Sequence, residues 1–255
     1  MVAAKRFRSY KNCVTFLVMR RSLFRWLLLV TFLPLALFGQ DPSRYELRKE
    51  HDPNGIGKFY MGREIARVMG HQAADWLERP EREREESPQK MIEALELKPG
   101  MVVADVGVGT GYHAFRMSPL VGAKGKVLGV DIQQEMLDLL ADKAKELGIT
   151  NVEGVLGTES DPKLPEGAVD LVLMVDVYHE LEFPYEEMLA IKKSLKQGGR
   201  VALVEFRMED PKVPIKLVHK LSEAQAKKEM EAVGLKWQKT VNTLPWQHLI
   251  LFIKE

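Results

Sequence analysis

Acidic and glycine residues at regular spacing mark the stretch of this chain that is best suited to hold a charged ligand. Residues 101–112 read Met-Val-Val-Ala-Asp-Val-Gly-Val-Gly-Thr-Gly-Tyr, so Asp105 follows a short apolar run and precedes Gly107, Gly109 and Gly111. Such a run is typical of a buried parallel strand, and the glycines allow a tight turn after it. The turn and the helix expected behind it would present backbone N–H groups and a positive helix end to a ligand.

Asp105 indicates which ligand suits this turn. Nicotinamide and flavin proteins also carry glycines at this place, but with the spacing G-x-G-x-x-G, and their pyrophosphate would be repelled by the Asp105 carboxylate. A ligand with a positive group for Asp105 and a carboxylate for the helix N-terminus fits better. S-adenosylmethionine has both, because its amino group can meet Asp105 and its carboxylate can meet the N–H groups of the turn.

A second acid follows at the end of the next predicted strand. Residues 126–130 form that strand, and Asp131 comes twenty residues after Gly111. An acid at this position can accept hydrogen bonds from both hydroxyls of a ribose. The alternative is that Asp131 caps the amphipathic helix that follows it. We favour ribose binding.

Residues that could take part in chemistry follow a further predicted strand, residues 169–175. They are Asp176, His179 and Glu180, and ligands of doubly wound sheets bind beyond the carboxyl ends of such strands. His179 and Glu180 are candidate bases, since methyl transfer to an oxygen or nitrogen nucleophile gains from proton removal. Equally, His179 could make a hydrogen bond at the start of a helix and Glu180 could be a charged loop residue. The rate would then come from positioning the nucleophile against the methyl group. No second His or Cys lies at ligand spacing, so no metal is expected.

Taken together, these segments resemble the class I S-adenosylmethionine-dependent methyltransferases, and among them the branch that contains ubiquinone/menaquinone-type methyltransferases. The resemblance rests on residues 105–111, 129–131, 170–176 and 195–199, and it extends over about residues 88–255. It implies an α/β, Rossmann-like, doubly wound sheet of seven strands, mostly parallel, with an antiparallel last strand. Gln197 departs from the family pattern, which has Pro before the paired glycines.

The resemblance also implies the cofactor, the acceptor and the binding residues. The cofactor is S-adenosylmethionine, and the methyl acceptor is a small or lipid-like molecule. An acid after the third strand is expected to hold the adenine amino group, but Thr158, Glu159 and Asp161 are equally consistent with an ordinary polar turn. The implied cofactor contacts are Asp105, Gly107, Gly109, Gly111, Tyr112, Asp131, Ile132, Thr158, Glu159 and Asp176.

The chain N-terminal to these motifs divides into three parts. Residues 1–40 join a basic stretch to an apolar run from Trp26 to Phe38, which predicts a signal peptide or membrane anchor and hence an exported or anchored protein. Residues 41–58 read as a linker, and residues 59–97 as a helical extension before the methyltransferase domain over 98–255. Polar residues of the extension, namely Tyr60, Arg63, His71 and Arg79, could either be solvated or reach over the cofactor.

Composition limits the other functions that are open to the chain. A net charge of +1 gives no overall attraction to nucleic acid, and one cysteine excludes an internal disulfide. Two alternatives remain besides the methyltransferase: a module that binds S-adenosylmethionine without transferring its methyl group, and an NAD(P)-dependent oxidoreductase, which Asp105 disfavours. Export also conflicts with a cofactor that is made in the cytoplasm, unless the segment is a retained anchor or translation starts elsewhere, for example at Met19.

Overall fold

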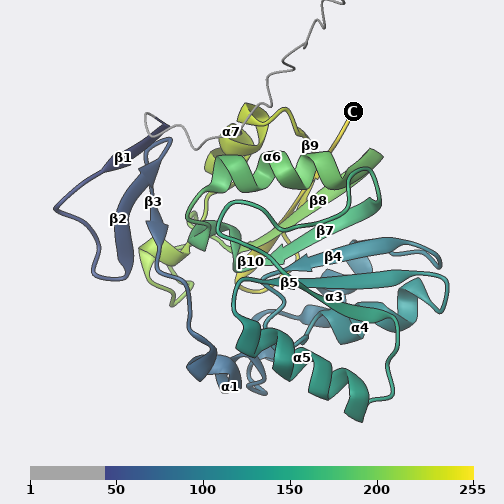
Figure 1. The fold of residues 1–255 in the computed structure, drawn as a ribbon. Coiled ribbons are helices and arrows are strands. Elements are labelled where there is room, and N and C mark those ends of the chain that lie inside the picture. Colours follow the sequence, from purple (N-terminus) through teal and green to yellow (C-terminus); the bar gives the residue numbers. More distant parts are fainter. Residues whose placement is uncertain (1–43) are drawn as a thin grey trace, which may run out of the picture. The chain divides into compact units, whose positions relative to one another are not determined.

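A seven-stranded sheet forms the centre of the protein, of which the computed structural model describes residues 44–255. Its order is β6-β5-β4-β7-β8-β10-β9, and β10 alone runs antiparallel to both of its neighbours (Figure 1). The predicted doubly wound sheet with an antiparallel last strand is therefore confirmed. The strands are β4 (Val102–Val106), β5 (Lys126–Asp131), β6 (Val152–Leu156), β7 (Val169–Val175), β8 (Leu195–Phe206), β9 (Lys236–Val241) and β10 (Gln247–Ile253).

Helices cover both faces of this sheet. In Figure 1, α6 and α7 lie above it, and α3, α4 and α5 lie below it. Their bounds are α3 (Pro88–Ala94), α4 (Ala114–Val121), α5 (Gln134–Glu146), α6 (Pro184–Ser194) and α7 (Glu223–Ala232). Ser222 caps α7, because its side chain accepts a hydrogen bond from the Gln225 N–H at 3.1 Å.

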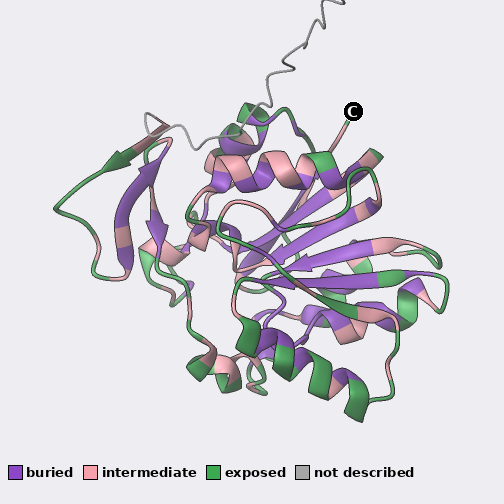
Figure 2. Cartoon of the chain, viewed as in Figure 1, coloured by how far each residue is buried: buried purple, intermediate pink, exposed green. Residues whose placement is uncertain are grey.

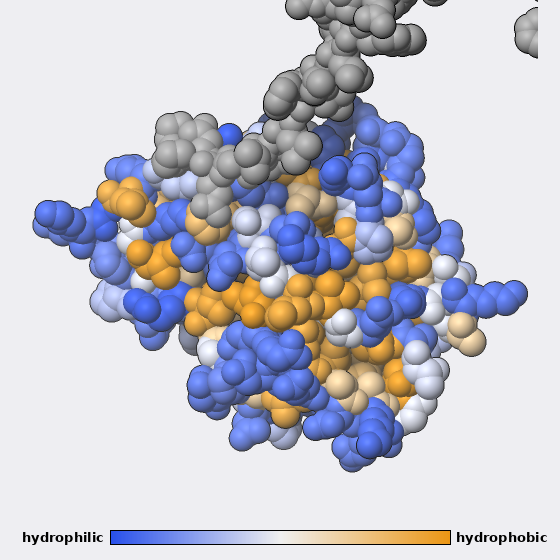
Figure 3. All heavy atoms as spheres, viewed as in Figure 1, coloured by the Kyte–Doolittle hydropathy of each residue, from blue (hydrophilic) through white to orange (hydrophobic). Residues whose placement is uncertain are grey.

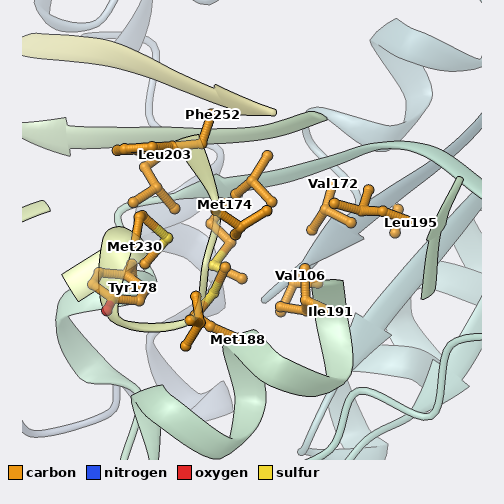
Figure 4. Packing of buried hydrophobic residues seen from close by; sticks show 14 of the residues in the cluster. Val106, Val172, Met174, Tyr178, Met188, Ile191, Leu195, Leu203, Met230 and Phe252 are labelled. Carbon is orange, nitrogen blue, oxygen red and sulfur yellow. The ribbon is translucent and has the colours of Figure 1, made fainter. Parts of the chain in front are cut away.

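Alternating strand residues pack into two hydrophobic clusters, one on each face. Along β7, Val172 and Met174 point toward α6 and α7, whereas Leu171 and Leu173 point toward α3, α4 and α5. Figure 4 shows Met174 with side chains of α6 and α7 in the first cluster. Unlike the edge strands β6 and β9, the inner strands β4, β5, β7, β8 and β10 are largely buried (Figure 2). Burial on both faces explains why these strands read as continuous apolar runs in the sequence.

The chain before the central sheet differs from the sequence prediction. A second, antiparallel sheet is formed by β1 (Tyr45–Leu47), β2 (Gly55–Tyr60) and β3 (Arg63–Ala66). It replaces most of the linker predicted over 41–58 and the first part of the helical extension predicted over 59–97. That extension is helical only from residue 71 on, in short helices that include α1 (Ala74–Leu77) and α2 (Arg82–Glu85).

A turn without a sequence signature explains this error. Met61 and Gly62 connect β2 to β3, and both have a positive φ, of 50° and 97°. That conformation is typical of a two-residue hairpin turn, in which Asn-Gly is the usual signal and Met is rare. The apolar residues around the turn, which include Ile65, have a spacing that also fits a helix, so the pattern alone favoured the wrong element.

The predicted signal peptide or membrane anchor over 1–40 lies outside the described residues. Within residues 44–255, no helix is both long and apolar enough to cross a membrane.

Candidate active site

A cavity of about 950 Å³ opens at the carboxyl ends of β4, β5 and β7. This volume lies in the upper part of the range of ~300–1,000 Å³ that is usual for small-molecule sites. The loops after these strands supply Gly107, Asp131 and His179 to its wall, while Trp76 and Ile215 come from segments on either side. Figure 3 shows an apolar band between α6 and α5, with hydrophilic residues along both of its sides.

The glycine turn after β4 has the conformation that requires glycine. Gly107, Gly109 and Gly111 have φ values of 71°, 53° and 86°. A Cβ on Gly107 would lie 2.4 Å from Val177 Cγ2, and one on Gly109 would lie 2.7 Å from Leu77 Cδ1. Gly107 and Gly109 line the cavity, whereas Gly111 does not and packs against side chains of α4 and α5.

The N–H groups of this turn are less available than the sequence suggests. Gly107 donates to the Val130 carbonyl at 2.8 Å, and Gly109 donates to Asp131 Oδ2 at 3.1 Å. Both donors are therefore satisfied within the protein. Arg82, which the sequence did not single out, places a buried cation in the cavity wall, and its guanidinium is bonded to Glu86 Oε2, to the Leu77 carbonyl and to His113 Nε2.

Asp105 is buried behind the turn and does not line the cavity. It is 3% exposed, and its Oδ2 has no hydrogen-bond partner among the described residues. Burial raises the pKa of Asp105 to about 7, although the Arg82 guanidinium lowers it, and the Asp131 charge raises it further. An unsatisfied buried carboxylate of this kind would be stabilised by a cationic group such as the amino group of S-adenosylmethionine.

Asp131 links the glycine turn to the end of β5. Its Oδ2 accepts from Gly109, and its Oδ1 accepts from the Gln133 N–H at 3.0 Å. The position before α5 is occupied by Gln133, so Asp131 is not the helix N-cap that was the alternative interpretation. Burial raises the pKa of Asp131 in spite of these N–H donors. Asp131 and the exposed Ile132 both line the cavity, as ribose binding requires.

Only some of the polar residues in the turn after β6 line the cavity. Thr158 and Glu159 line the cavity, but Asp161 forms a 2.7 Å ion pair with Lys163 and does not. Glu187 on α6 is a further acid in the cavity wall, and burial raises its pKa to about 8. No sequence signal marks Glu187, because a lone Glu in an amphipathic helix is normally solvated.

Two other predicted cofactor residues have partners within the protein. Tyr112 does not line the cavity, and its hydroxyl donates to Glu83 Oε1 at 3.0 Å. Asp176 does line it, with a φ of 54°, and its Oδ2 accepts from Gln247 at 2.7 Å. Burial raises the pKa of Asp176 well above its usual range, and the charges of Glu86 and Glu205 add to this effect.

His179 and Glu180 line the cavity, and the fold connects them to residues that are distant in the sequence. His179 Nδ1 lies 2.6 Å from Glu205 Oε2, and His179 Nε2 lies 3.1 Å from His219 Nδ1. Burial opposes a charge on His179, but the Glu205 carboxylate outweighs it and raises the pKa. Burial raises the pKa of Glu180 to about 7. Arg207, which follows the end of β8, does not pair with Glu205 and donates to backbone carbonyls such as that of Gln247.

Four residues of the N-terminal segment were considered as possible covers for the cofactor, and none of them lines the cavity. Arg63 pairs with Glu229 at 2.9 Å, Arg79 pairs with Glu86 at 2.7 Å, and His71 lies 3.9 Å from Glu135. The residues of this segment that do line the cavity include Val68, Trp76, Leu77 and Arg82.

The sheet order, the glycine turn and the acid that ends β5 define a class I S-adenosylmethionine-dependent methyltransferase domain. Residues 97–249 match the family model described as "Methyltransferase domain", and the chain belongs to that family. The donor of this class is S-adenosylmethionine. The residues present fit it: Asp131 lines the cavity where the ribose would bind, and Asp105, buried directly behind the glycine turn, has a carboxylate oxygen without a partner that suits a cationic amino group.

Individual relatives agree with this family. The chain is 30% identical over 122 residues to the uncharacterized methyltransferase YcgJ of Bacillus subtilis, which covers 48% of this chain and 47% of that protein. It is 30% identical over 116 residues to the ubiquinone/menaquinone biosynthesis C-methyltransferase UbiE of Vibrio vulnificus, covering 45% of each. The chain therefore spans about half the length of the curated relatives it matches.

A solved structure extends the comparison to the fold. It is a SAM-dependent methyltransferase from Aquifex aeolicus, with a TM-score of 0.69 and 27% sequence identity. The match covers 73% of this chain and 99% of that chain.

Proposed function

We propose that this protein transfers the methyl group of S-adenosylmethionine to a small, largely apolar acceptor that carries an acidic hydroxyl group. One observation carries the proposal: a single cavity is lined both by Asp131 and the glycine turn and by His179, which is bonded behind the wall to the buried Glu205. Its volume of about 950 Å³ is suited to a cofactor and a small second molecule, because drug-sized ligands alone occupy sites at the lower end of the usual range.

The wall of the cavity supports an apolar acceptor. It consists mainly of hydrophobic side chains from the N-terminal segment, the loop after β7 and the connection between β8 and α7, and these are Val68, Met69, Trp76, Leu181, Phe206, Pro214 and Ile215. Burial of an apolar molecule against them would supply roughly 25 cal/mol for each Å² removed from water. The name of the Vibrio relative, a ubiquinone/menaquinone biosynthesis C-methyltransferase, supports a lipid-like acceptor here.

The chemistry requires little from the protein beyond alignment and proton removal. His179 would take the hydroxyl proton, and Glu205 would orient the ring and stabilise the imidazolium through the 2.6 Å contact. The deprotonated acceptor would then attack the methyl carbon, and the bond electrons would leave with sulfur as S-adenosylhomocysteine. Alignment of nucleophile and methyl group can contribute up to ~7–11 kcal/mol.

Methyl-labelled S-adenosylmethionine tests the proposal when it is incubated with the full chain and separate pools of small phenols and quinols, peptides, and nucleic acids. Label should appear in the first pool together with S-adenosylhomocysteine. Asp131→Ala should abolish this transfer, whereas Asp138→Ala, an exposed acid on α5, should leave it unchanged. Label confined to peptides or nucleic acids would contradict the proposal. Cofactor binding without turnover in any pool would indicate a binding module.

A further inference from the structure

We infer that His179, Glu180 and His219 form a binding site for a divalent transition-metal ion inside the cavity. These three residues are called the His–Glu cluster below. His179 Nε2 lies 3.1 Å from His219 Nδ1, and Glu180 Oε1 lies 3.9 Å from His179 Nε2 and 3.8 Å from His219 Nδ1. Each residue offers one ligand atom, and the three atoms form a compact triangle.

The triangle has nearly the dimensions that an ion requires. Metal ligands of this kind lie ~2.0–2.2 Å from zinc, which places neighbouring ligand atoms of a tetrahedral or octahedral ion about 3.0–3.5 Å apart. The edge between the two histidines already falls in this range. The other two edges exceed it by a few tenths of an ångström, a difference that a small rotation of the Glu180 side chain removes.

A second shell of contacts holds His179 in the orientation that a ligand needs. Its Nδ1 bonds to the buried Glu205 carboxylate at 2.6 Å, so the lone pair of Nε2 points toward the centre of the cluster. Carboxylates that orient metal-binding histidines in this way are usual in metalloproteins. The His179 carbonyl also accepts a 3.0 Å hydrogen bond from Arg63, which fixes the backbone of the loop.

The contact between the two histidines does not explain the cluster by itself. A hydrogen bond between His179 and His219 involves only two of the three residues. Glu180 accepts a backbone hydrogen bond from Met69, but its carboxylate also faces both rings at distances too long for hydrogen bonds. A cation shared by the three groups accounts for all three positions. The sequence does not reveal this set, because His219 comes 40 residues after His179 and lies on a separate turn, η4 (Leu217–His219).

The ligand types indicate the class of ion and its use. Two imidazoles and one carboxylate suit Zn²⁺, Fe²⁺ or Co²⁺ and leave positions open for other ligands. All three residues line the cavity, so an acceptor hydroxyl can occupy an open position. This role rests on the proposed function and changes one step of it, because an ion on His179 Nε2 would take the place of that nitrogen as the group that removes the proton. The bound hydroxyl would lose its proton to solvent and attack the methyl carbon, and the carbon–sulfur electrons would remain on S-adenosylhomocysteine. Metal binding itself does not depend on that step.

Titration of the chelator-treated full chain with Co²⁺ tests the site, because visible absorption bands of Co²⁺ report nitrogen and oxygen ligands directly. The wild-type chain should bind one equivalent with bands of four- to five-coordinate Co²⁺. Affinity should fall at least tenfold in His219→Ala and in Glu180→Gln. His71→Ala is the matched control, since His71 lies 3.9 Å from the Glu135 carboxylate on the surface, and it should bind like the wild type.

Thermal melting without metal should show that His219→Ala, which changes a partly exposed side chain, remains folded. Absence of saturable Co²⁺ binding in the wild type would overturn the inference, and so would equal loss in His71→Ala and His219→Ala. S-adenosylmethionine binding is measured on the same samples. Cofactor binding without Co²⁺ binding overturns this inference alone, whereas Co²⁺ binding without cofactor binding overturns the proposed function alone.

Discussion

Asp105 shows how a single side chain can favour function at the expense of stability. Its carboxylate is buried with Oδ2 unsatisfied, and the Asp131 charge lies close enough to raise its pKa further. Such a group destabilises the folded protein whenever it is ionised. A cationic ligand removes this cost, so the residue is better suited to the bound state than to the free one.

Asp105→Asn is therefore expected to stabilise the free protein and to weaken cofactor binding. The pKa of Asp105 is about 7 in the folded protein and about 3.9 in the unfolded chain, so the free energy of unfolding falls as pH rises between these values. Asn cannot ionise. The gain of the variant over the wild type should be about 2–3 kcal/mol larger at pH 8 than at pH 5, measured by urea unfolding.

Calorimetry on the same variant should show S-adenosylmethionine affinity at least tenfold lower than in the wild type. Unchanged affinity would refute the assignment of Asp105 to the cofactor. A stability gain independent of pH would show that the carboxylate is not the buried, strained group described above.

Some residues of the cavity could be predicted from the sequence and others could not. Gly107, Gly109 and Asp131 were predicted correctly as neighbours at the sheet edge, because strand ends and glycine turns have local signatures. His219 and Glu187 were missed, since their approach to the cavity depends on tertiary packing and not on any local pattern. Among them, His219 changes the chemistry that the site can perform.

At the scale of elements, the glycine turn between β4 and α4 can be compared with a glycine inside β8 that has a similar φ. Gly107 and Gly198 have φ values of 71° and 76°, but only a Cβ on Gly107 would meet another side chain, that of Val177 at 2.4 Å. Gly198 faces open space. Alanine substitutions at the two positions therefore separate the cost of backbone strain, which both share, from the cost of the contact with Val177, which only Gly107 has.

Gly198→Ala should cost about 1–2 kcal/mol of unfolding free energy through backbone strain alone. Gly107→Ala should cost that amount and a further ~1–3 kcal/mol, because Val177 must move. It should also reduce S-adenosylmethionine affinity, while Gly198→Ala should not. Chemical denaturation and calorimetry measure the two effects, and equal stability losses would argue against the contact with Val177.

The N-terminal sheet is tied to the main domain by a buried ion pair. Arg63 on β3 bonds to Glu229 on α7 through two 2.9 Å contacts, and Tyr178 donates to the same carboxylate at 2.7 Å.

Arg63→Ala leaves a buried carboxylate without its cation, which should cost about 3–5 kcal/mol in urea unfolding. The double variant Arg63→Met with Glu229→Gln should lose less, since no unpaired charge remains. An equal loss would show that packing, not charge, is responsible.

At the scale of the whole molecule, the cofactor should stabilise the folded chain. Binding at a concentration of one hundred times the Kd adds about 2.7 kcal/mol to the free energy of unfolding. For a protein of this size each kcal/mol raises the Tm by ~2–4 °C, so S-adenosylmethionine should raise it by roughly 5–10 °C. NAD at the same concentration should not, and an equal shift with NAD would revive the oxidoreductase alternative.

The sequence predicted the central sheet well and its N-terminal neighbour poorly. Strands such as β4 and β7 are buried on both faces, so their apolar runs and the turns after them identify them directly. The hairpin formed by β2 and β3 has no such signal, because Met61-Gly62 is an unusual turn and the apolar spacing fits a helix as well.

The buried Arg63–Glu229 pair has a consequence for how this domain could be exchanged or recombined. The family match begins at residue 97, yet a module cut there would lose Arg63 and leave the Glu229 carboxylate buried without its cation. It would also lose the aromatic and aliphatic wall that Trp76 and Leu77 contribute to the cavity. A fragment that is to fold and keep its cavity when moved into another protein should therefore begin with the small sheet, well before residue 97, where the family match starts.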